Sequence, residues 1–164
     1  MRARTIPILW LALAGMPSVA CRQASGAGLA GGAPSRDALV RGFVTALERR
    51  DTAALVDLVL TRAEFASVYY PTAREALPPY ELPQDLMWFR LVGESDRGLR
   101  RALDELGGRP LRYRGHTCGE PRREGRNRLW GWCRVRLGED EISIFGLIVE
   151  RDGRFKFVSY ANKL

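Results

Sequence analysis

The chain has 164 residues and a formal net charge of +7, and 46% of its residues are hydrophobic. That length suits one domain with a hydrophobic core, and the sequence shows neither an internal repeat nor a second domain. The positive charge is almost all arginine, since the only lysines are Lys156 and Lys163. A GC-rich genome explains that bias as well as functional selection does, so the charge informs on solubility and partners rather than on the fold.

The start of the chain has the pattern of a secretion signal. Arg2 and Arg4 form a basic beginning, residues 6–14 are a short and mostly apolar run, and residues 18–20 are small enough to suit a cleavage site. The apolar run is too short to span a bilayer permanently. Residues 1–20 are therefore predicted to be a signal peptide.

Cys21 directly follows the predicted cleavage point. The stretch resembles a bacterial lipobox, in which this cysteine becomes the lipidated N-terminus, although Ser18 stands where leucine is usual. Residues 18–20 also suit the ordinary signal peptidase, so plain secretion is the alternative. Because a cysteine at this position is improbable by chance, we expect an exported lipoprotein, anchored to a membrane and facing the periplasm or the cell exterior.

The rest of the chain divides into a tether and one folded part. Residues 22–34 are rich in glycine, alanine and serine and have no periodicity, so residues 21–34 are predicted to be the lipidated cysteine and a flexible tether. Residues 35–164 are predicted to form a single α+β domain.

Two cysteines remain, Cys118 and Cys133, and an oxidising compartment favours a disulfide between them. Directly paired cysteines in neighbouring strands need the same face of the sheet. In simple alternation, however, Cys133 falls on the Leu/Val face of its strand and Cys118 on the Arg/His face of its own. Either Gly115 marks a bulge that reverses the alternation, or Cys118 lies beyond the end of its strand.

The first half of the domain carries helical signals. Ser35 precedes an apolar pattern at helical spacing, which predicts a helix over residues 36–50. Asp51 is suited to cap a second helix, and Thr61 with Glu64 forms a capping box for a third. Two more helices are predicted, one over residues 83–93 and one over residues 99–106, each stopped by a glycine.

The last third alternates in the manner of β-strands. Strands are predicted over residues 111–118, 129–137, 142–149 and 155–160. Residues 142–149 are apolar on both faces, which places that strand centrally, and Asp152-Gly153 supplies a tight turn before the last strand. Helices followed by strands predict an α+β fold in which the N-terminal helices pack on an antiparallel sheet of about four strands.

Two stretches resemble a known family. Residues 43–51 and 53–55 have the pattern of a long helix, an acidic turn residue and a short helix, and residues 153–160 have that of a closing hairpin. Both are similar to the nuclear transport factor 2-like superfamily, over residues 35–164 in element order. The resemblance implies a cone with a pocket between a curved antiparallel sheet and the helices. Some members are isomerases, dehydratases or cyclases and many only bind, so the fold does not settle the function.

No position matches a catalytic residue of that superfamily. His116, the only histidine, has no carboxylate at a recognisable spacing, so a surface or strand-end role is expected rather than catalysis. Tyr69 and Tyr70, beside a proline-rich loop over residues 71–83, either rim a pocket or belong to a plain surface connection. The scattered carboxylates have no metal-ligand spacing, so neither a metal nor a cofactor is expected.

Arginine and tryptophan gather on two neighbouring predicted strands. One face would carry Arg112, Arg114, His116, Trp130, Trp132, Arg134 and Arg136. Guanidinium groups over indole rings form a basic aromatic surface that suits an anionic partner. The alternative, which we favour because aromatic residues in strands are usually packing residues, is that the tryptophans are core and the arginines extend from its edge.

Three functional hypotheses follow. The leading one is a non-enzymatic binding domain of the cell envelope, held to the membrane by its lipid, with an anionic or protein partner and no nucleic acid. The second is a small-molecule isomerase or dehydratase, which would need a buried carboxylate facing a tyrosine at the floor of a pocket. The third is a secreted structural or inhibitory protein that has no ligand.

Overall fold

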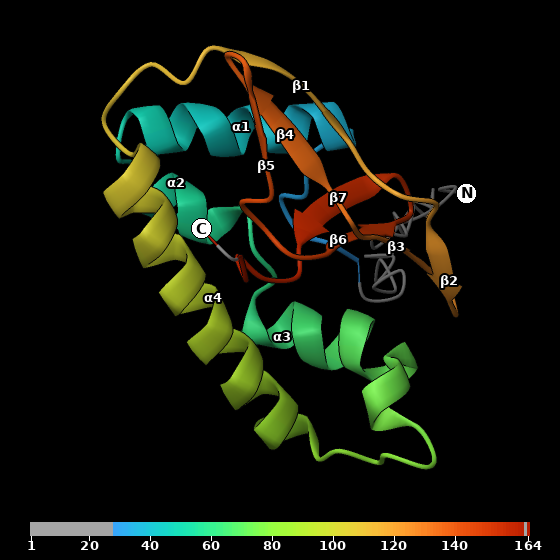
Figure 1. Cartoon of the computed structure of the whole chain (residues 1–164). Coiled ribbons are helices and arrows are strands. Elements are labelled where there is room, and N and C mark those ends of the chain that lie inside the picture. The colour runs from blue at the N-terminus through green and yellow to red at the C-terminus, as the bar shows by residue number, and fades with distance from the viewer. Residues whose placement is uncertain (1–27, 163) are drawn as a thin grey trace, which may run out of the picture.

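The computed structural model describes residues 28–162 and 164 (Figure 1). Helices come first and strands follow, which confirms the α+β class. The helices are α1 (Arg36–Glu48), α2 (Thr52–Asp57), α3 (Arg62–Glu64) and α4 (Gln84–Leu106), and one turn of π-helix (Phe65–Tyr69) and two 3₁₀ turns (Tyr70–Thr72 and Arg74–Ala76) follow α3. None of the helices in the described part is long and apolar enough to cross a membrane.

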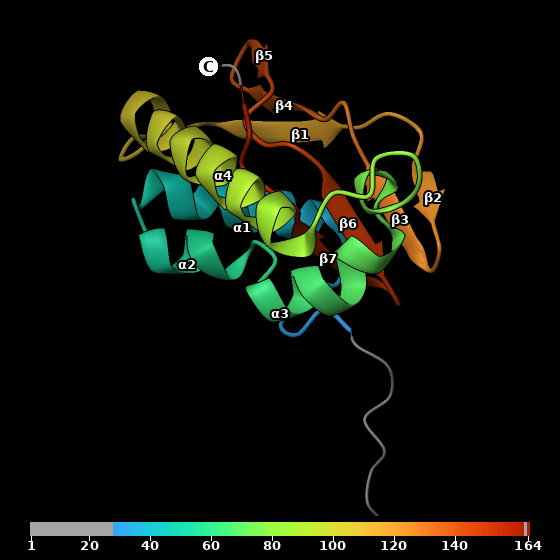
Figure 2. The same ribbon diagram turned by 90° about the horizontal axis from the view of Figure 1, so that it is seen from below.

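The strands form two antiparallel sheets, of three and four strands. The first has the order β1-β4-β5, with β1 (Tyr113–Thr117), β4 (Arg134–Leu137) and β5 (Asp140–Ile142). The second has the order β2-β3-β6-β7, with β2 (Arg122–Glu124), β3 (Asn127–Trp130), β6 (Ile148–Arg151) and β7 (Arg154–Phe157). The predicted single sheet of about four strands therefore corresponds only loosely to these two sheets. Figure 2 places α2 and α3 at one end of the molecule and β5 at the other.

The helices start where their capping residues predict. The Ser35 hydroxyl accepts a hydrogen bond from a backbone N–H in the first turn of α1 at 3.1 Å, and the Asp51 carboxylate does the same for α2 at 3.0 Å. At α3 the capping box is complete, because the Thr61 hydroxyl and the Glu64 carboxylate each accept from the other residue's backbone. These caps satisfy N–H groups that have no partner inside a helix.

The predicted helix end at Gly93 is wrong, because α4 runs without a break through that residue. A glycine inside a helix lowers its stability by only about 1 kcal/mol relative to alanine. The packing of the residues that follow Gly93 compensates for this loss. Ser95, Gly98 and Ala102 are buried on one face of α4. At Gly98 a Cβ atom would lie 1.8 Å from the carbonyl oxygen of Tyr160, so the helix crosses the C-terminal segment in direct backbone contact.

The hydrophobic core has two parts. The first lies between α1 and the strands, and its centre is a cluster of four aromatic rings whose centroids lie 4.5–5.7 Å apart, those of Phe43, Phe145, Phe157 and Tyr160. The second surrounds Phe65 after α3. In β6, Ile148 faces the first part and Val149 the second, so the four-stranded sheet is covered on both faces. The predicted strand over residues 142–149, buried on both sides, is thus found only at residues 148 and 149, since residues 143–147 belong to no strand.

The two sheets are halves of one long hairpin that is interrupted in its middle. Trp130 pairs with Ile148 at the ends of β3 and β6, and Val135 pairs with Ile142 in β4 and β5. Between these pairs, four residues lie on the outgoing side and five on the return (135 − 130 − 1 and 148 − 142 − 1). The one extra residue prevents continuous pairing, as in a β-bulge.

This interruption also changes which face each residue occupies. Trp132, in its middle, has a φ of +53°, in the left-handed region that side chains other than glycine rarely adopt. Before it Leu129 faces the second part of the core, and after it Val135 faces the first, although simple alternation would place both on one face. The continuous strands predicted over residues 129–137 and 142–149 are therefore wrong at this point.

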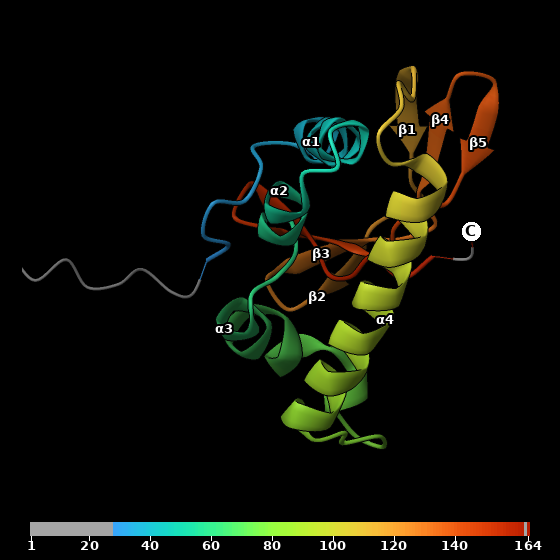
Figure 3. The same cartoon turned by 90° about the vertical axis from the view of Figure 1, so that its left-hand side faces the viewer.

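The folded part begins before residue 35. Leu29 is buried, and Ala33 exchanges two backbone hydrogen bonds with Phe155 of β7, at 2.9 and 3.0 Å. Residues 29–33 therefore pack against the edge of the four-stranded sheet, within the stretch predicted to be a tether. In Figure 3 this segment, in blue, lies on the opposite side of the molecule from β4 and β5.

Cys118 and Cys133 form the disulfide that the sequence predicts. Both explanations that the sequence offered for the mismatch between their faces apply. Gly115 has a φ of +143° and stands at a register shift between β1 and β4, and Cys118 lies just beyond the end of β1. The disulfide joins the chain after β1 to the interruption before β4.

Replacement of Gly98 by alanine is expected to destabilise the fold by at least about 3 kcal/mol, because the new methyl group would collide with the Tyr160 backbone. Gly93 is the matched control on the same helix, since a Cβ there meets only the end of the Arg97 side chain at 3.5 Å. Gly93→Ala should stabilise by about 0.5–1 kcal/mol through helix propensity. Urea unfolding of both variants measures the difference, and equal effects would contradict the close crossing.

Candidate functional site

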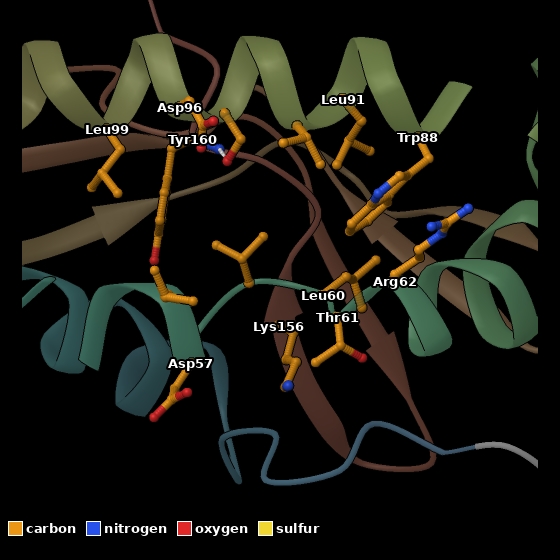
Figure 4. Close-up of a pocket in the computed structure, with 14 residues that line it drawn as sticks. Asp57, Leu60, Thr61, Arg62, Trp88, Leu91, Asp96, Leu99, Lys156 and Tyr160 are labelled. Carbon is orange, nitrogen blue, oxygen red and sulfur yellow. Dashed lines mark hydrogen bonds between the residues drawn. The ribbon is translucent and has the colours of Figure 1, made fainter. Parts of the chain in front are cut away.

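The candidate site is a pocket between α4 and the link from α2 to α3 (Figure 4). Its volume is about 300 Å³, at the small end of the range for sites that bind small molecules. Trp88, Leu91 and Leu99 form the wall on α4, and residues 56–62 form much of the opposite wall. Tyr160, after β7, stands between them (Figure 4). Most of the lining is apolar.

A buried ion pair lies at the base of this pocket. The Lys156 ammonium of β7 and the Glu64 carboxylate are 3.0 Å apart, with 5% and 7% of their side chains exposed. The Glu64 Oε2 atom also accepts hydrogen bonds from the backbone and the hydroxyl of Thr61. In Figure 4 the Lys156 ammonium points away from α4, so the aliphatic part of the side chain faces the pocket.

The pair holds the pocket wall in place more than it stabilises the protein. Burying two charges costs about as much free energy as their attraction returns. Removing one partner would instead leave a lone buried charge, at a cost of about 3–5 kcal/mol. Lys156 and Glu64 therefore fix the α2–α3 link to β7 in one arrangement, and that arrangement positions the wall opposite α4.

Apart from the buried Oε1 atom of Glu64, which has no hydrogen-bond partner among the described residues, the polar groups around the pocket are either exposed or already engaged. Asp57 and Asp96 line the pocket but are exposed to solvent. The Tyr160 hydroxyl donates a hydrogen bond to the Leu55 carbonyl at 2.6 Å, and burial raises the pKa of Tyr160. The phenol is thus directed at the backbone of α2 and not at a carboxylate.

His116 belongs to a hydrogen-bonded chain that sequence reasoning missed. The Tyr113 hydroxyl lies 2.9 Å from His116 Nδ1 and 3.4 Å from the Asp37 carboxylate. The single hydroxyl proton serves only one of these acceptors, so the tautomer of His116 is coupled to the bond that Tyr113 makes with Asp37. The pocket beside α4 includes none of the three residues, and the chain ties α1 to β1.

The surroundings of His116 favour its neutral form. Burial lowers the pKa of His116, and the guanidinium groups of Arg36 and Arg41 lower it further, against the opposing effect of Asp37. Arg41 also lies 2.6 Å from Asp37, and this hydrogen bond holds the pKa of that carboxyl below its usual range.

Stability is therefore expected to fall as the pH drops below about 6.5, the ordinary pKa of histidine. The unfolded chain takes up a proton at His116 in this range while the folded chain resists it, so acidification favours unfolding until the lower folded pKa is passed. His116→Gln should lose this part of the pH dependence between pH 7 and pH 5, above the range in which Asp37 titrates. Urea unfolding at each pH gives the comparison. A wild type and a variant with parallel stability profiles would show that His116 is not the group responsible.

The structure separates the side chains of the predicted arginine and tryptophan face. Trp130 packs against the first part of the core, with the Arg36 guanidinium 3.8 Å from its ring centroid. Trp132 is instead 92% exposed. Arg134 and Arg136 are exposed on the uncovered face of the three-stranded sheet, where the alternation of β4 directs them. One tryptophan is thus a packing residue and the other is not.

The remaining predicted site residues are dispersed. Arg112 and Arg114 are exposed, and Arg114 lies 3.7 Å from the Glu139 carboxylate. Tyr69 is buried in the second part of the core, where burial raises its pKa. Tyr70 packs against the same cluster and donates a hydrogen bond from its hydroxyl to a backbone carbonyl of the proline-rich loop at 3.0 Å. Cys21 lies outside the described residues.

One sequence signal could have identified the buried pair. Lys156 is one of only two lysines and alternates with Phe155 and Phe157 along a strand. A charged residue on a strand of a sheet buried on both faces needs a buried partner. Its partner Glu64 was assigned only a capping role. In the described part of the chain, no group of three or more His, Cys, Asp or Glu side chains is placed to hold a metal ion.

Comparison with models of protein families, with curated proteins and with solved structures finds no match for this chain.

Proposed function

We propose that this protein is a cell-envelope lipoprotein whose folded part, of the nuclear transport factor 2-like kind, binds a small apolar molecule in the pocket beside α4 without converting it. The observation that carries the proposal is the lining of that pocket. Trp88, Leu91 and Leu99 face it from α4, and the charged pair at its base turns its ammonium away. Such a site gains affinity mainly from burial of apolar surface.

The geometry favours binding over catalysis. An isomerase or dehydratase would need a carboxylate and a tyrosine that converge on the same substrate atom. In this pocket the Tyr160 hydroxyl already donates to a backbone carbonyl, and Asp57 and Asp96 are exposed at the surface. The presence of an apolar pocket also favours a ligand-binding protein over a purely structural or inhibitory one.

The expected ligand is small and mainly hydrocarbon. A cavity of about 300 Å³ holds a compact ring or a short chain, and a larger molecule would extend out of its open side. The exposed carboxylates of Asp57 and Asp96 stand beside the pocket, where they would disfavour an acidic group on the ligand. A neutral apolar molecule therefore fits this site better than a fatty acid.

Binding of the neutral fluorophore N-phenyl-1-naphthylamine tests this proposal. Leu99→Trp adds bulk inside the pocket and should weaken binding at least about tenfold, because the apolar volume is filled. Phe89→Trp is the matched control, since Phe89 lies on the same helix and is 76% exposed. Fluorescence titration gives the affinities, and circular dichroism checks that both variants fold. Equal affinity of all three proteins would place the binding elsewhere and refute the proposal.

The membrane anchor is tested separately by the intact mass of the mature protein from its native host. A chain that starts at Cys21 and carries a diacyl or triacyl increment is the expected result. Cys21→Ser should lose the increment and leave the membrane fraction. An unmodified N-terminus in the wild type would rule out the lipoprotein and leave the alternative of plain secretion.

A further inference from the structure

A second concave surface opens where the long hairpin is interrupted. The Trp132 groove, as we name it, has a volume of about 720 Å³. Its lining includes Arg122, Trp132, Arg134, Ile142, Phe145 and Leu147. The groove therefore combines an apolar floor with two guanidinium groups at its sides. It is separate from the pocket beside α4, which has different lining residues.

The residues on both sides of Trp132 are bonded to a neighbouring segment of the chain. Cys133 is fixed by the disulfide, and the carbonyl of Gly131 accepts a hydrogen bond from Gly119 at 2.9 Å. The Trp132 side chain is nevertheless 92% exposed. Tryptophan is the residue most enriched among those that dominate binding energy at protein interfaces, and a constrained backbone lowers the entropy lost on binding. The exposed indole is therefore suited to anchor a partner.

The charges beside Trp132 favour an anionic partner. Arg134 and Arg136 are exposed on the same uncovered sheet face, and among the described residues neither lies within 4.0 Å of a carboxylate oxygen. Arg122 is paired with Glu124 at 2.8 Å, and Glu141 is the one acidic side chain in the groove lining. The unpaired guanidinium group of Arg134 at the groove, together with that of Arg136 farther along the same sheet face, attracts a chain that carries carboxylates and apolar side chains together.

The shape of the groove suits an extended peptide. The pairing of β3 with β6 ends at Trp130, and the pairing of β4 with β5 ends at Ile142. Regular sheet structure therefore does not fill the groove between these two ends. An extended chain directs alternate side chains to opposite sides. Apolar side chains of such a segment would meet the partly exposed Ile142 and Leu147, while its carboxylates would face Arg134.

The position of the groove argues against a membrane as the occupant. Residues 29–33 lie on the opposite side of the molecule from β4 and β5 (Figure 3). Gly28 follows Cys21 by seven positions (28 − 21), a span of at most about 25 Å. If the proposed anchor holds, so short a tether keeps the far side of the domain away from the bilayer and turned toward other proteins.

From these observations we propose that the Trp132 groove binds an extended acidic segment of a partner protein, with an apolar side chain of that segment packed beside Trp132. This goes beyond the small-molecule pocket and uses different residues. The test begins with selection from a displayed library of linear peptides. The expected result is enrichment of sequences that alternate glutamate or aspartate with large apolar residues.

The enriched peptide, labelled with fluorescein, is then titrated by fluorescence anisotropy. Trp132→Ala and Arg134→Glu should each weaken binding at least about tenfold, and the affinity of the wild type should fall as salt is raised. Phe89→Ala and Arg100→Glu are the matched controls, since they remove an exposed aromatic ring and reverse an exposed charge on α4. Both controls should bind as the wild type does.

Three results would overturn the proposal. The first is a selected peptide without acidic residues, or one whose affinity is indifferent to Trp132→Ala. The second is binding to vesicles of phosphatidylcholine and phosphatidylglycerol that depends on Trp132, which would make the surface a membrane contact. The third is a dimer that Trp132→Ala dissociates, because a second copy would then be the occupant. The fluorophore result for Leu99→Trp is independent of all three.

Discussion

The fold depends on one local constraint, the left-handed backbone conformation of Trp132 in the middle of the long hairpin. With one extra residue on the return side, continuous pairing cannot pass this point, and the side chains change faces. The β3–β6 half is then buried on both faces and the β4–β5 half on one. The same constraint produces a covered sheet, an uncovered arginine-bearing face and the groove between them.

A buried charge pair joins the helices to this sheet. Hydrophobic packing alone tolerates small shifts between layers, whereas the 3.0 Å contact of Lys156 with Glu64 permits one register. Because Glu64 also caps α3, the pair fixes the start of that helix and the link that precedes it. The pocket beside α4 is the space left between this fixed link and the helix. Its shape is thus set by an interaction that contributes little net stability.

The sequence predicts the features of this fold that depend on neighbouring residues. Caps such as Ser35 and the Thr61–Glu64 box act within one turn of helix, so the starts of helices can be predicted from the sequence. The disulfide follows from the number of cysteines. The interruption at Trp132 cannot be predicted from residues 129–137 alone, because they alternate without a break. The difference in residue number appears only when these residues are paired with the return strand. Likewise Glu64, the partner of Lys156, and Asp37, which Tyr113 links to His116, lie far along the chain from these residues.

The arginine and tryptophan face illustrates the same limit. Arg134 and Arg136 follow the alternation of β4 and are exposed, as the pattern indicates. Trp130 belongs to the same pattern but precedes the change of face, so it packs beneath Arg36 while Trp132 is exposed. A period of two predicts faces only while pairing is continuous. The sequence therefore named Trp132 among several possible binding residues but favoured a core position for both tryptophans, and only the tertiary structure separates Trp132 from Trp130.

The two candidate binding surfaces share one wall, the segment that follows β7. Tyr160 lines the pocket, and Asn162 lines the groove. Transmission between sites requires an element with two arrangements. The Asn162 amide donates to the carbonyls of Gly98 and Ile144 at 2.9 and 3.3 Å, and α4 contacts the Tyr160 backbone directly at Gly98. These contacts hold the shared segment in one position. A ligand in the pocket is therefore expected to leave this wall in place, so binding at the two proposed surfaces is expected to be independent.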